Sequence, residues 1–153
     1  MNPRESITYF AAEDVEQVDQ LLTGFRGDTQ ARCVVLVDRS GRLLTAAGDT
    51  GSMDRVTFAS LVAGDFAASD QLASLLGEQE FSTLYHQGDG RSMYLADVSG
   101  WAILAALFDG RTTLGMVRLK SKAVVPKFVD LFTGFAARGD RAAPMVFEAG
   151  WAS

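Results

Sequence analysis

Two short apolar runs constrain the fold of this chain more than any other feature. They are Cys33 to Val37 (CVVLV) and Trp101 to Phe108 (WAILAALF). Each run is apolar at both alternating sets of positions, so a strand formed by either one must be covered on both faces. The sequence therefore predicts two central strands in a sheet that has helices on both sides. The longer run is still too short to span a bilayer.

The other strands follow from turn residues and alternation. The turn DRSG at residues 38–41 and a return run from Arg42 to Ala46 predict a hairpin. Phe81 to Gln87, Ser92 to Val98 and the second apolar run predict a meander of three strands. The segment from Ser82 to Gln87 is polar, so we expect an edge strand whose free backbone could pair with a second copy.

Three helices complete the pattern. Periodic apolar positions predict a helix over Ala11 to Phe25 ended by Gly27, a long helix over Arg55 to Leu76, and a last helix capped by Thr113. Pro126 is expected to break or kink the last helix near Lys122. The order is α-β-β-α-β-β-β-α. It predicts an α+β fold with an antiparallel sheet of about five strands and helices on both faces.

A chain of 153 residues has the length of one domain. We expect a single domain over residues 1–138 and a mobile C-terminal tail over residues 139–153.

The long helix has two differently built sides. Asp54 is its expected N-cap and Gly77 its expected stop. Bulky apolar residues are predicted to bury against the sheet: Phe58, Leu61, Val62, Phe66, Leu72, Leu75 and Leu76. Small residues are predicted to face outward: Ser60, Ala63, Gly64, Ala67 and Ala68. A glycine inside a helix costs about 1 kcal/mol relative to alanine. The small side therefore predicts the close approach of a second backbone.

Charge and composition exclude some partners. The formal net charge is -5 and no basic cluster is interleaved with aromatic residues, so nucleic acid is not an expected partner. Acidic residues crowd the first helix: Glu13, Asp14, Glu16 and Asp19. Basic residues crowd a later segment: Arg111, Arg118, Lys120, Lys122 and Lys127. We expect these two segments to be neighbours with complementary surfaces, in preference to a membrane or phosphate role.

The cysteine and the N-terminal sequence bear on the compartment. The single Cys33 is expected to be a small buried hydrophobe, and the N-terminal residues show no signal pattern. These features predict a cytoplasmic protein that does not insert into a membrane.

The sequence lacks a catalytic constellation. His86 is its one histidine, so a multi-histidine metal site cannot form. On the expected edge strand beside Tyr85 it is read as structural or interfacial in preference to a general base, so a nucleophile–histidine triad is not expected. It contains no phosphate-binding GxxxxGK[ST] loop. Glu78 and Glu80 are read as charges in a solvated turn. Four arginines are read as solvated loop charges in preference to an arginine finger: Arg39, Arg55, Arg91 and Arg111. The sequence therefore predicts a binding module with no catalytic residue, no metal and no cofactor.

Three strings taken together resemble the bacterial roadblock (dynein light chain type) family. They are VVLVDRSGRLL, FASLVAGDFAASDQLASLLGEQEFSTLYHQGDGRSMYL and LFDGRTTLGMVRLK, and they cover Ala31 to Lys120 in order. The likeness is strongest to the members that regulate a Ras-like polarity GTPase. The resemblance implies a roadblock, or profilin-like, fold. It also implies a homodimer in which the long helices and edge strands of two copies meet.

The resemblance further implies a GTPase-activating protein for a small Ras-like GTPase in its GTP form, with a role in cell polarity or motility. No arginine finger is supplied in such proteins; docking rearranges the switch regions of the GTPase. The implied partner-binding residues are Ser60, Ala63, Gly64, Ala67, Ala68 and Gln71. The implied dimer residues are Leu84, Tyr85, His86, Ala59 and Ala63.

The sequence departs from the family pattern at two places, and two alternative functions remain open. Pro126 interrupts a helix that family members continue, and the tail PMVFEAGWAS does not match the extension linked to nucleotide exchange, so that activity is not transferred. One alternative is a roadblock scaffold that tethers a GTPase or another partner without stimulating it. The other is a small-molecule sensor or enzyme with a pocket walled by His86 and Tyr85.

Overall fold

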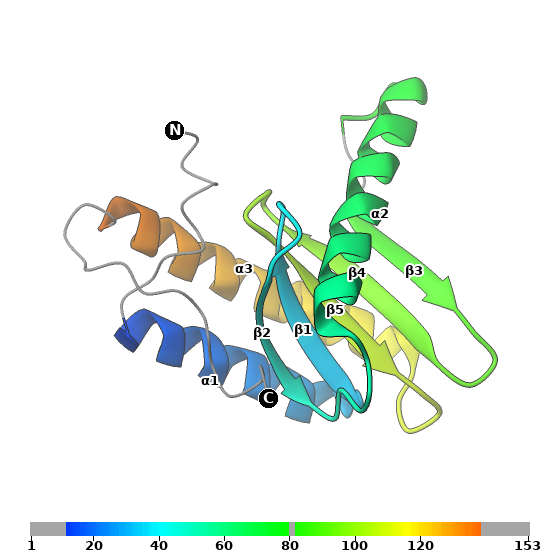
Figure 1. Ribbon diagram of the computed structural model, residues 1–153, viewed down its shortest axis with the longest axis horizontal. Coiled ribbons are helices and arrows are strands. Elements are labelled where there is room, and N and C mark those ends of the chain that lie inside the picture. Colours follow the sequence, from blue (N-terminus) through cyan, green and yellow to red (C-terminus); the bar gives the residue numbers. More distant parts are fainter. Residues whose placement is uncertain (1–11, 80–81, 139–153) are drawn as a thin grey trace.

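The computed structural model describes residues 12–79 and 82–138, and it confirms the predicted order of elements. The helices are α1 (Ala12–Thr29), α2 (Arg55–Leu75) and α3 (Leu114–Ala137). The strands are β1 (Cys33–Asp38), β2 (Leu43–Gly48), β3 (Thr83–Gln87), β4 (Ser92–Val98) and β5 (Ala102–Phe108). The predicted α+β class with helices on both faces of one sheet is confirmed (Figure 1).

The five strands form one antiparallel sheet in the order β2-β1-β5-β4-β3. The two apolar runs are β1 and β5, which lie side by side inside the sheet, and every residue of β1 is buried. The polar strand β3 lies at one edge and pairs only with β4. The predicted positions of the central strands and of the edge strand are therefore confirmed.

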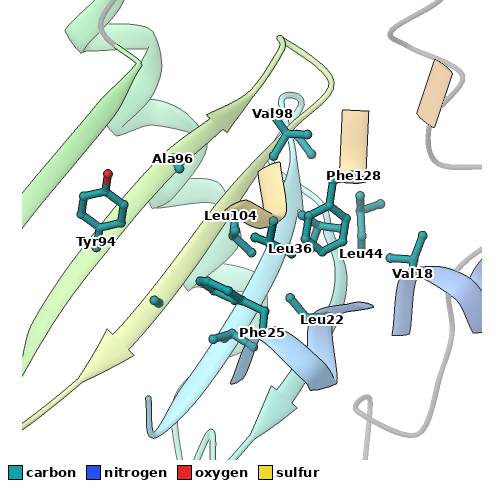
Figure 2. Packing of buried hydrophobic residues seen from close by; sticks show 14 of the residues in the cluster. Val18, Leu22, Phe25, Leu36, Leu44, Tyr94, Ala96, Val98, Leu104 and Phe128 are labelled. Carbon is teal, nitrogen blue, oxygen red and sulfur yellow. The ribbon is translucent and has the colours of Figure 1, made fainter. Parts of the chain in front are cut away.

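Each face of the sheet has its own core. On one face α1 and α3 lie side by side, and Leu22 and Phe128 pack with Leu36 and Leu104 (Figure 2). On the other face α2 crosses the sheet alone, and its Val62 and Phe66 pack with Val35, Val37 and Ile103 (Figure 1). The two-sided apolar character of the central strands thus follows from having helices on both sides.

The end of α1 differs from the prediction. The helix does not stop at Gly27 but continues to Thr29, and Gln30 follows it with a φ of 59°. The buried stripe continues past Gly27 because Thr29 is buried. The Thr29 hydroxyl donates to the Arg26 carbonyl oxygen at 3.1 Å, and the Arg26 Nε donates to the Ala31 carbonyl oxygen at 3.0 Å. These bonds stabilise a helix end that glycine alone does not fix.

The helix α3 also differs from the prediction, because it runs through Pro126 without a break. Pro126 and Lys122, four residues earlier, both lie on the exposed side of the helix. Water can therefore bond to the Lys122 carbonyl that lacks a helical partner, which limits the cost of the proline. The predicted cap is confirmed: the Thr113 hydroxyl oxygen accepts from the Met116 N–H at 3.1 Å.

The acidic and basic segments are neighbours, but their charges do not meet as expected. The acidic start of α1 meets the end of α3, where Arg138 Nη2 lies 2.9 Å from Asp14 Oδ1. Within residues 12–79 and 82–138, no ion pair involves the basic residues inside α3: Arg118, Lys120, Lys122 and Lys127. The expectation of complementary surfaces therefore fails for these four residues.

Some predictions fall outside the described residues. These are the C-terminal tail at residues 139–153, Glu80 in the turn after α2, and the start of the polar strand at Phe81. Of the helices in the described parts of the chain, none has the length and apolar character that crossing a membrane requires. Across the same parts, no group of three or more His, Cys, Asp or Glu residues could hold a metal ion.

The thiol of Cys33 is buried, as predicted, and its pKa is raised to about 11 by burial and by the nearby Asp49. At pH 8 the thiolate fraction is therefore about 100-fold below that of an ordinary cysteine. We expect iodoacetamide to label Cys33 at least about tenfold more slowly in the folded protein than in urea, as measured by mass spectrometry. Equal rates in both states would contradict the burial.

Candidate partner-binding surface

The helix α2 begins at a well-formed cap. The Thr57 N–H donates to Asp54 Oδ1 at 3.1 Å, and the Thr57 hydroxyl donates to Asp54 Oδ2 at 2.8 Å. These two bonds hold the pKa of the Asp54 carboxyl below its usual value. The predicted N-cap is confirmed, and the first turn of α2 is fixed without help from the sheet.

This cap makes stability depend on pH. A carboxyl whose pKa is lowered by folding stabilises the protein above its unfolded pKa, and the contribution is lost as pH falls through the folded value. We expect Asp54→Ala to lower the Tm at pH 7 and to have little effect near pH 2. Asp54→Ser, which keeps a capping oxygen, serves as the control. Thermal melts followed by circular dichroism test this, and an equal loss at both pH values would contradict it.

The helix α2 ends as predicted at Gly77. Gly77 has a φ of 81°, its N–H donates to the Ser74 carbonyl oxygen, and the Glu78 N–H donates to the Ala73 carbonyl oxygen at 2.9 Å. This pattern is a Schellman motif, which needs a left-handed residue at Gly77. Both ends of α2 are thus fixed by local bonds.

The side of α2 that packs on the sheet is only partly the predicted one. The buried residues are Ala59, Val62, Phe66, Ser69 and Ala73, which follow one line along the helix. Val62 and Phe66 were predicted to be buried, and Phe58 packs beside them. Four residues predicted to be buried are instead exposed: Leu61, Leu72, Leu75 and Leu76. The prediction used residue size to decide which side of α2 is buried. Because α2 carries apolar residues all round, packing against the sheet decides this instead.

The exposed side of α2 is therefore apolar as well as small. We call it the α2 outer face and define it by Ser60, Leu61, Gly64, Ala67, Ala68, Gln71, Leu72 and Leu75. Leu61 is 67% exposed, Leu72 57% and Leu75 83%. Among the described residues, five of the eight exposed large apolar side chains belong to α2 or to its C-cap Leu76. Such a concentration of exposed apolar side chains on one helix is typical of interaction surfaces.

The two margins of α2 lie over different parts of the sheet. On one margin, Asp65 Oδ2 lies 2.7 Å from His86 Nε2 of the edge strand β3. Leu61 and Leu72 are four residues before and seven after Asp65, so they lie on this margin. We call Leu61, Leu72, Leu75 and Leu76 the leucine strip. It lies on the same side of the protein as the free edge of the sheet.

The opposite margin lies beside the turn between β1 and β2. Arg39 Nη2 contacts Asp70 Oδ2 at 2.8 Å, and its guanidinium lies over the Phe66 ring. Gly41 also lies close to this margin: a Cβ on Gly41 would sit 3.5 Å from the Ser60 Cα. We call Ser60, Ala63, Gly64 and Ala67 the small-residue strip. It is turned away from the free edge of the sheet.

Gly64 is exposed in mid-helix, and a Cβ added there would meet nothing within 4 Å. Packing within the chain therefore does not require a glycine at this position. Gly24 and Gly27 in α1 also have open space, so a helical glycine alone does not mark a site. What distinguishes Gly64 is its position within the small-residue strip, beside exposed leucines.

The edge strand β3 offers a free backbone beside α2. The Gly88 N–H bonds to the Arg91 carbonyl, and the Asp97 N–H bonds to the Ser82 carbonyl. In an antiparallel ladder these bonds turn the N–H groups of Leu84 and His86 toward β4. The N–H groups of Thr83, Tyr85 and Gln87 then point away from the sheet. β3 is therefore open to pairing along its outer edge.

The residues implied as a dimer interface are not all on one surface. Leu84 packs under α2 and His86 contacts Asp65, while Tyr85 stacks on Phe108 with the ring centroids 6.3 Å apart. Ala63 lies on the margin away from β3. Ala59 is only 1% exposed and packs in the core, so it offers no surface to a partner; this is a correction. Sequence reasoning missed the leucine strip, which does lie near the edge.

The residues implied as partner-binding remain together. Ser60, Gly64, Ala67, Ala68 and Gln71 are exposed on the α2 outer face, and Ala63 is half-buried at its margin. The protein's own sheet does not cover them.

The other candidate residues lie elsewhere. Arg39 is held by Asp70 and by Asp97, and Arg55 Nη2 donates to the Thr50 hydroxyl at 2.8 Å. An open hollow of about 620 Å³ lies near the start of α2. Its lining includes His86 and Arg91 but not Tyr85. His86 contacts Asp65 of α2 and Tyr85 stacks on Phe108 on the other face of the sheet, so these two residues do not wall one pocket together.

The comparisons with known proteins agree with the fold. Residues 17–108 match the model of the Roadblock/LC7 domain. The structure of Myxococcus xanthus MglB is 36% identical, with a TM-score of 0.74, and the match covers 77% of this chain and 96% of that one. The gliding protein MglB of Thermus thermophilus is 31% identical, with a TM-score of 0.75, covering 79% and 92%. No curated protein sequence gave a significant match.

The fold extends to more distant proteins. Acanthamoeba castellanii profilin II is 14% identical with a TM-score of 0.52, covering 76% of this chain and 96% of that one, which shows the profilin-like fold alone. With a domain match over more than half of its length and two MglB structures above 30% identity, this chain belongs to the Roadblock/LC7 family.

Proposed function

We propose that this protein is a cytoplasmic homodimer that binds a small Ras-like GTPase in its GTP form and stimulates GTP hydrolysis. Its role would be the control of cell polarity or motility. The observation that carries the proposal is the α2 outer face, an exposed apolar surface beside a free sheet edge. The likeness to MglB supports it.

The leucine strip and the small-residue strip suit two different partners. The leucine strip and the free edge of β3 lie on the same side, so a second copy can pair with β3 and bury the leucines by two-fold symmetry. One similar structure is described as MglB with a tetrameric arrangement, which supports self-association in such chains. The small-residue strip and Gln71 remain open on the other margin. A helix or loop of the GTPase can approach closely there.

Stimulation by this surface is allosteric in our proposal. Its exposed residues are all uncharged, so they supply neither a general base nor a charge for the transition state. Arg39 is engaged with Asp70 and Asp97. Docking can raise the rate only by binding the active arrangement of the GTPase more tightly than the inactive one. A hundredfold shift in that equilibrium needs a difference of about 2.7 kcal/mol.

Single-turnover GTP hydrolysis tests the proposal. The probe is a Ras-like GTPase from the same genome, loaded with GTP and mixed with increasing amounts of this protein. We expect the hydrolysis rate to rise with concentration and to saturate. Saturable binding without a change in rate would select the scaffold alternative, in which the protein tethers a GTPase without stimulating it. Absence of binding would overturn both.

A further inference from the structure

A second surface, on the opposite side of the sheet, combines exposed apolar residues with unpaired cations. Of the eight exposed large apolar side chains in the described residues, six belong to α2, its C-cap or β3, and the other two are Met116 and Leu119 of α3. Met116 is 40% exposed and Leu119 61%. The α3 cationic face is defined by Met116, Leu119, Arg118, Lys120, Lys122 and Lys127.

Cations outnumber acidic residues on this face. Residues 111–129 contain five cations and neither aspartate nor glutamate, in a chain of net charge -5. Among the residues that the structure describes, the four cations of α3 make no ion pair. Asp14 of α1 is bonded to Arg138 at the far end of α3, and Asp109 lies 3.8 Å from Arg32. Asp130 borders the face at one end.

The arrangement of these residues around α3 is that of a helix lying on an interface. Met116, Leu119 and Ala123 follow one exposed line, opposite the buried Val117 and Val124. Arg118 and Lys122 flank this line on one side, and Lys120 and Lys127 flank it on the other. Long cationic side chains on both flanks can reach one flat anionic plane while the apolar line touches it.

We propose that the α3 cationic face binds the surface of an anionic phospholipid bilayer. Charge complementarity selects this occupant. Two exposed apolar side chains are too few for stable insertion. Binding is therefore peripheral, reversible and weakened by salt.

Lipid binding by the α3 cationic face is compatible with the proposed function, and the proposal does not rest on that function. α3 and α2 lie on opposite faces of the sheet, so a protein held to a bilayer through α3 presents the α2 outer face to solution (Figure 1). Failure of lipid binding would leave GTPase binding untouched, and the reverse also holds.

Vesicle co-sedimentation of the full-length protein tests the proposal. The probes are vesicles of phosphatidylcholine alone and of phosphatidylcholine mixed with phosphatidylglycerol. We expect binding only to the mixed vesicles, and less of it as salt is raised. Each basic residue near such a surface changes partitioning roughly fivefold, so the double variant Arg118→Glu with Lys122→Glu should weaken binding at least about 25-fold.

The matched control reverses two exposed cations elsewhere, Arg42→Glu with Arg91→Glu, and gives the same net charge. It should bind much more strongly than the α3 double variant. Equal losses in the two variants, or no binding of the wild type to mixed vesicles, would overturn the proposal. Retention on immobilised polyglutamate without vesicle binding would also overturn it and would indicate an acidic protein partner. Unchanged thermal melts establish that both variants fold.

Discussion

Gly64→Arg is expected to abolish the stimulation of GTP hydrolysis while the protein still folds and dimerises. Gly64 is exposed, and a Cβ there meets no atom within 4 Å, so a larger side chain does not disturb the core. An arginine would extend over the small-residue strip and hold a docked partner several ångströms away. We therefore expect single-turnover hydrolysis to fall to the intrinsic rate of the GTPase, with unchanged oligomeric state in analytical ultracentrifugation.

Gly64→Ala is the matched control. It adds one methyl group in open space and removes the glycine penalty in mid-helix, so the free energy of unfolding should rise by about 1 kcal/mol. Most of the stimulation should remain, because a methyl group displaces a partner far less than a guanidinium does. Full stimulation by Gly64→Arg would exclude the small-residue strip as the docking site.

The double variant Leu61→Asp with Leu72→Asp is expected to convert the dimer to a monomer. Both leucines are exposed on the margin of α2 nearest β3. Full burial of a leucine contributes about 1.5–3 kcal/mol, and two-fold symmetry applies each change twice. The dimer dissociation constant should rise by more than about 1,000-fold, as measured by sedimentation equilibrium.

Val56→Asp is the control for an added charge, because Val56 is exposed on the same helix but on the other margin. It should leave the dimer intact.

A second pair of variants, at Tyr85, separates the contribution of strand pairing from that of side-chain contacts. Tyr85→Pro removes an N–H that points away from β4, whereas Tyr85→Ala keeps it. Dissociation by the proline alone indicates pairing along β3. A stable dimer in the leucine variant would contradict the assigned interface.

The sequence predicted the fold well because its strongest signals were local. The apolar runs of β1 and β5 required cover on both faces, and turn residues separated every pair of strands. Asp54, Gly77 and Thr113 carry the chemistry of helix ends, and all three were placed correctly. The family resemblance added the roadblock fold, which the comparison with MglB confirms.

The phase of α2 could not be predicted in the same way. Leu61 and Val62 are adjacent and similar, yet Val62 is buried and Leu61 is exposed. A helix that is apolar all round gives no contrast between its faces, so only packing against the sheet decides. The ion pair between α1 and α3 could not be predicted from the sequence either, because it depends on the antiparallel packing of the two helices, which brings Asp14 to Arg138. Sequence composition predicted neighbours but not which ends would meet.

The most direct test of the central claim is photo-crosslinking from the α2 outer face to the GTPase. A benzoylphenylalanine at Gln71, in the middle of that face, should capture the GTP-loaded Ras-like GTPase. The same group at Gln20, exposed on α1 across the sheet, should not. Capture from Gln20 with none from Gln71 would contradict the account, because it would place the GTPase on the other layer of the protein.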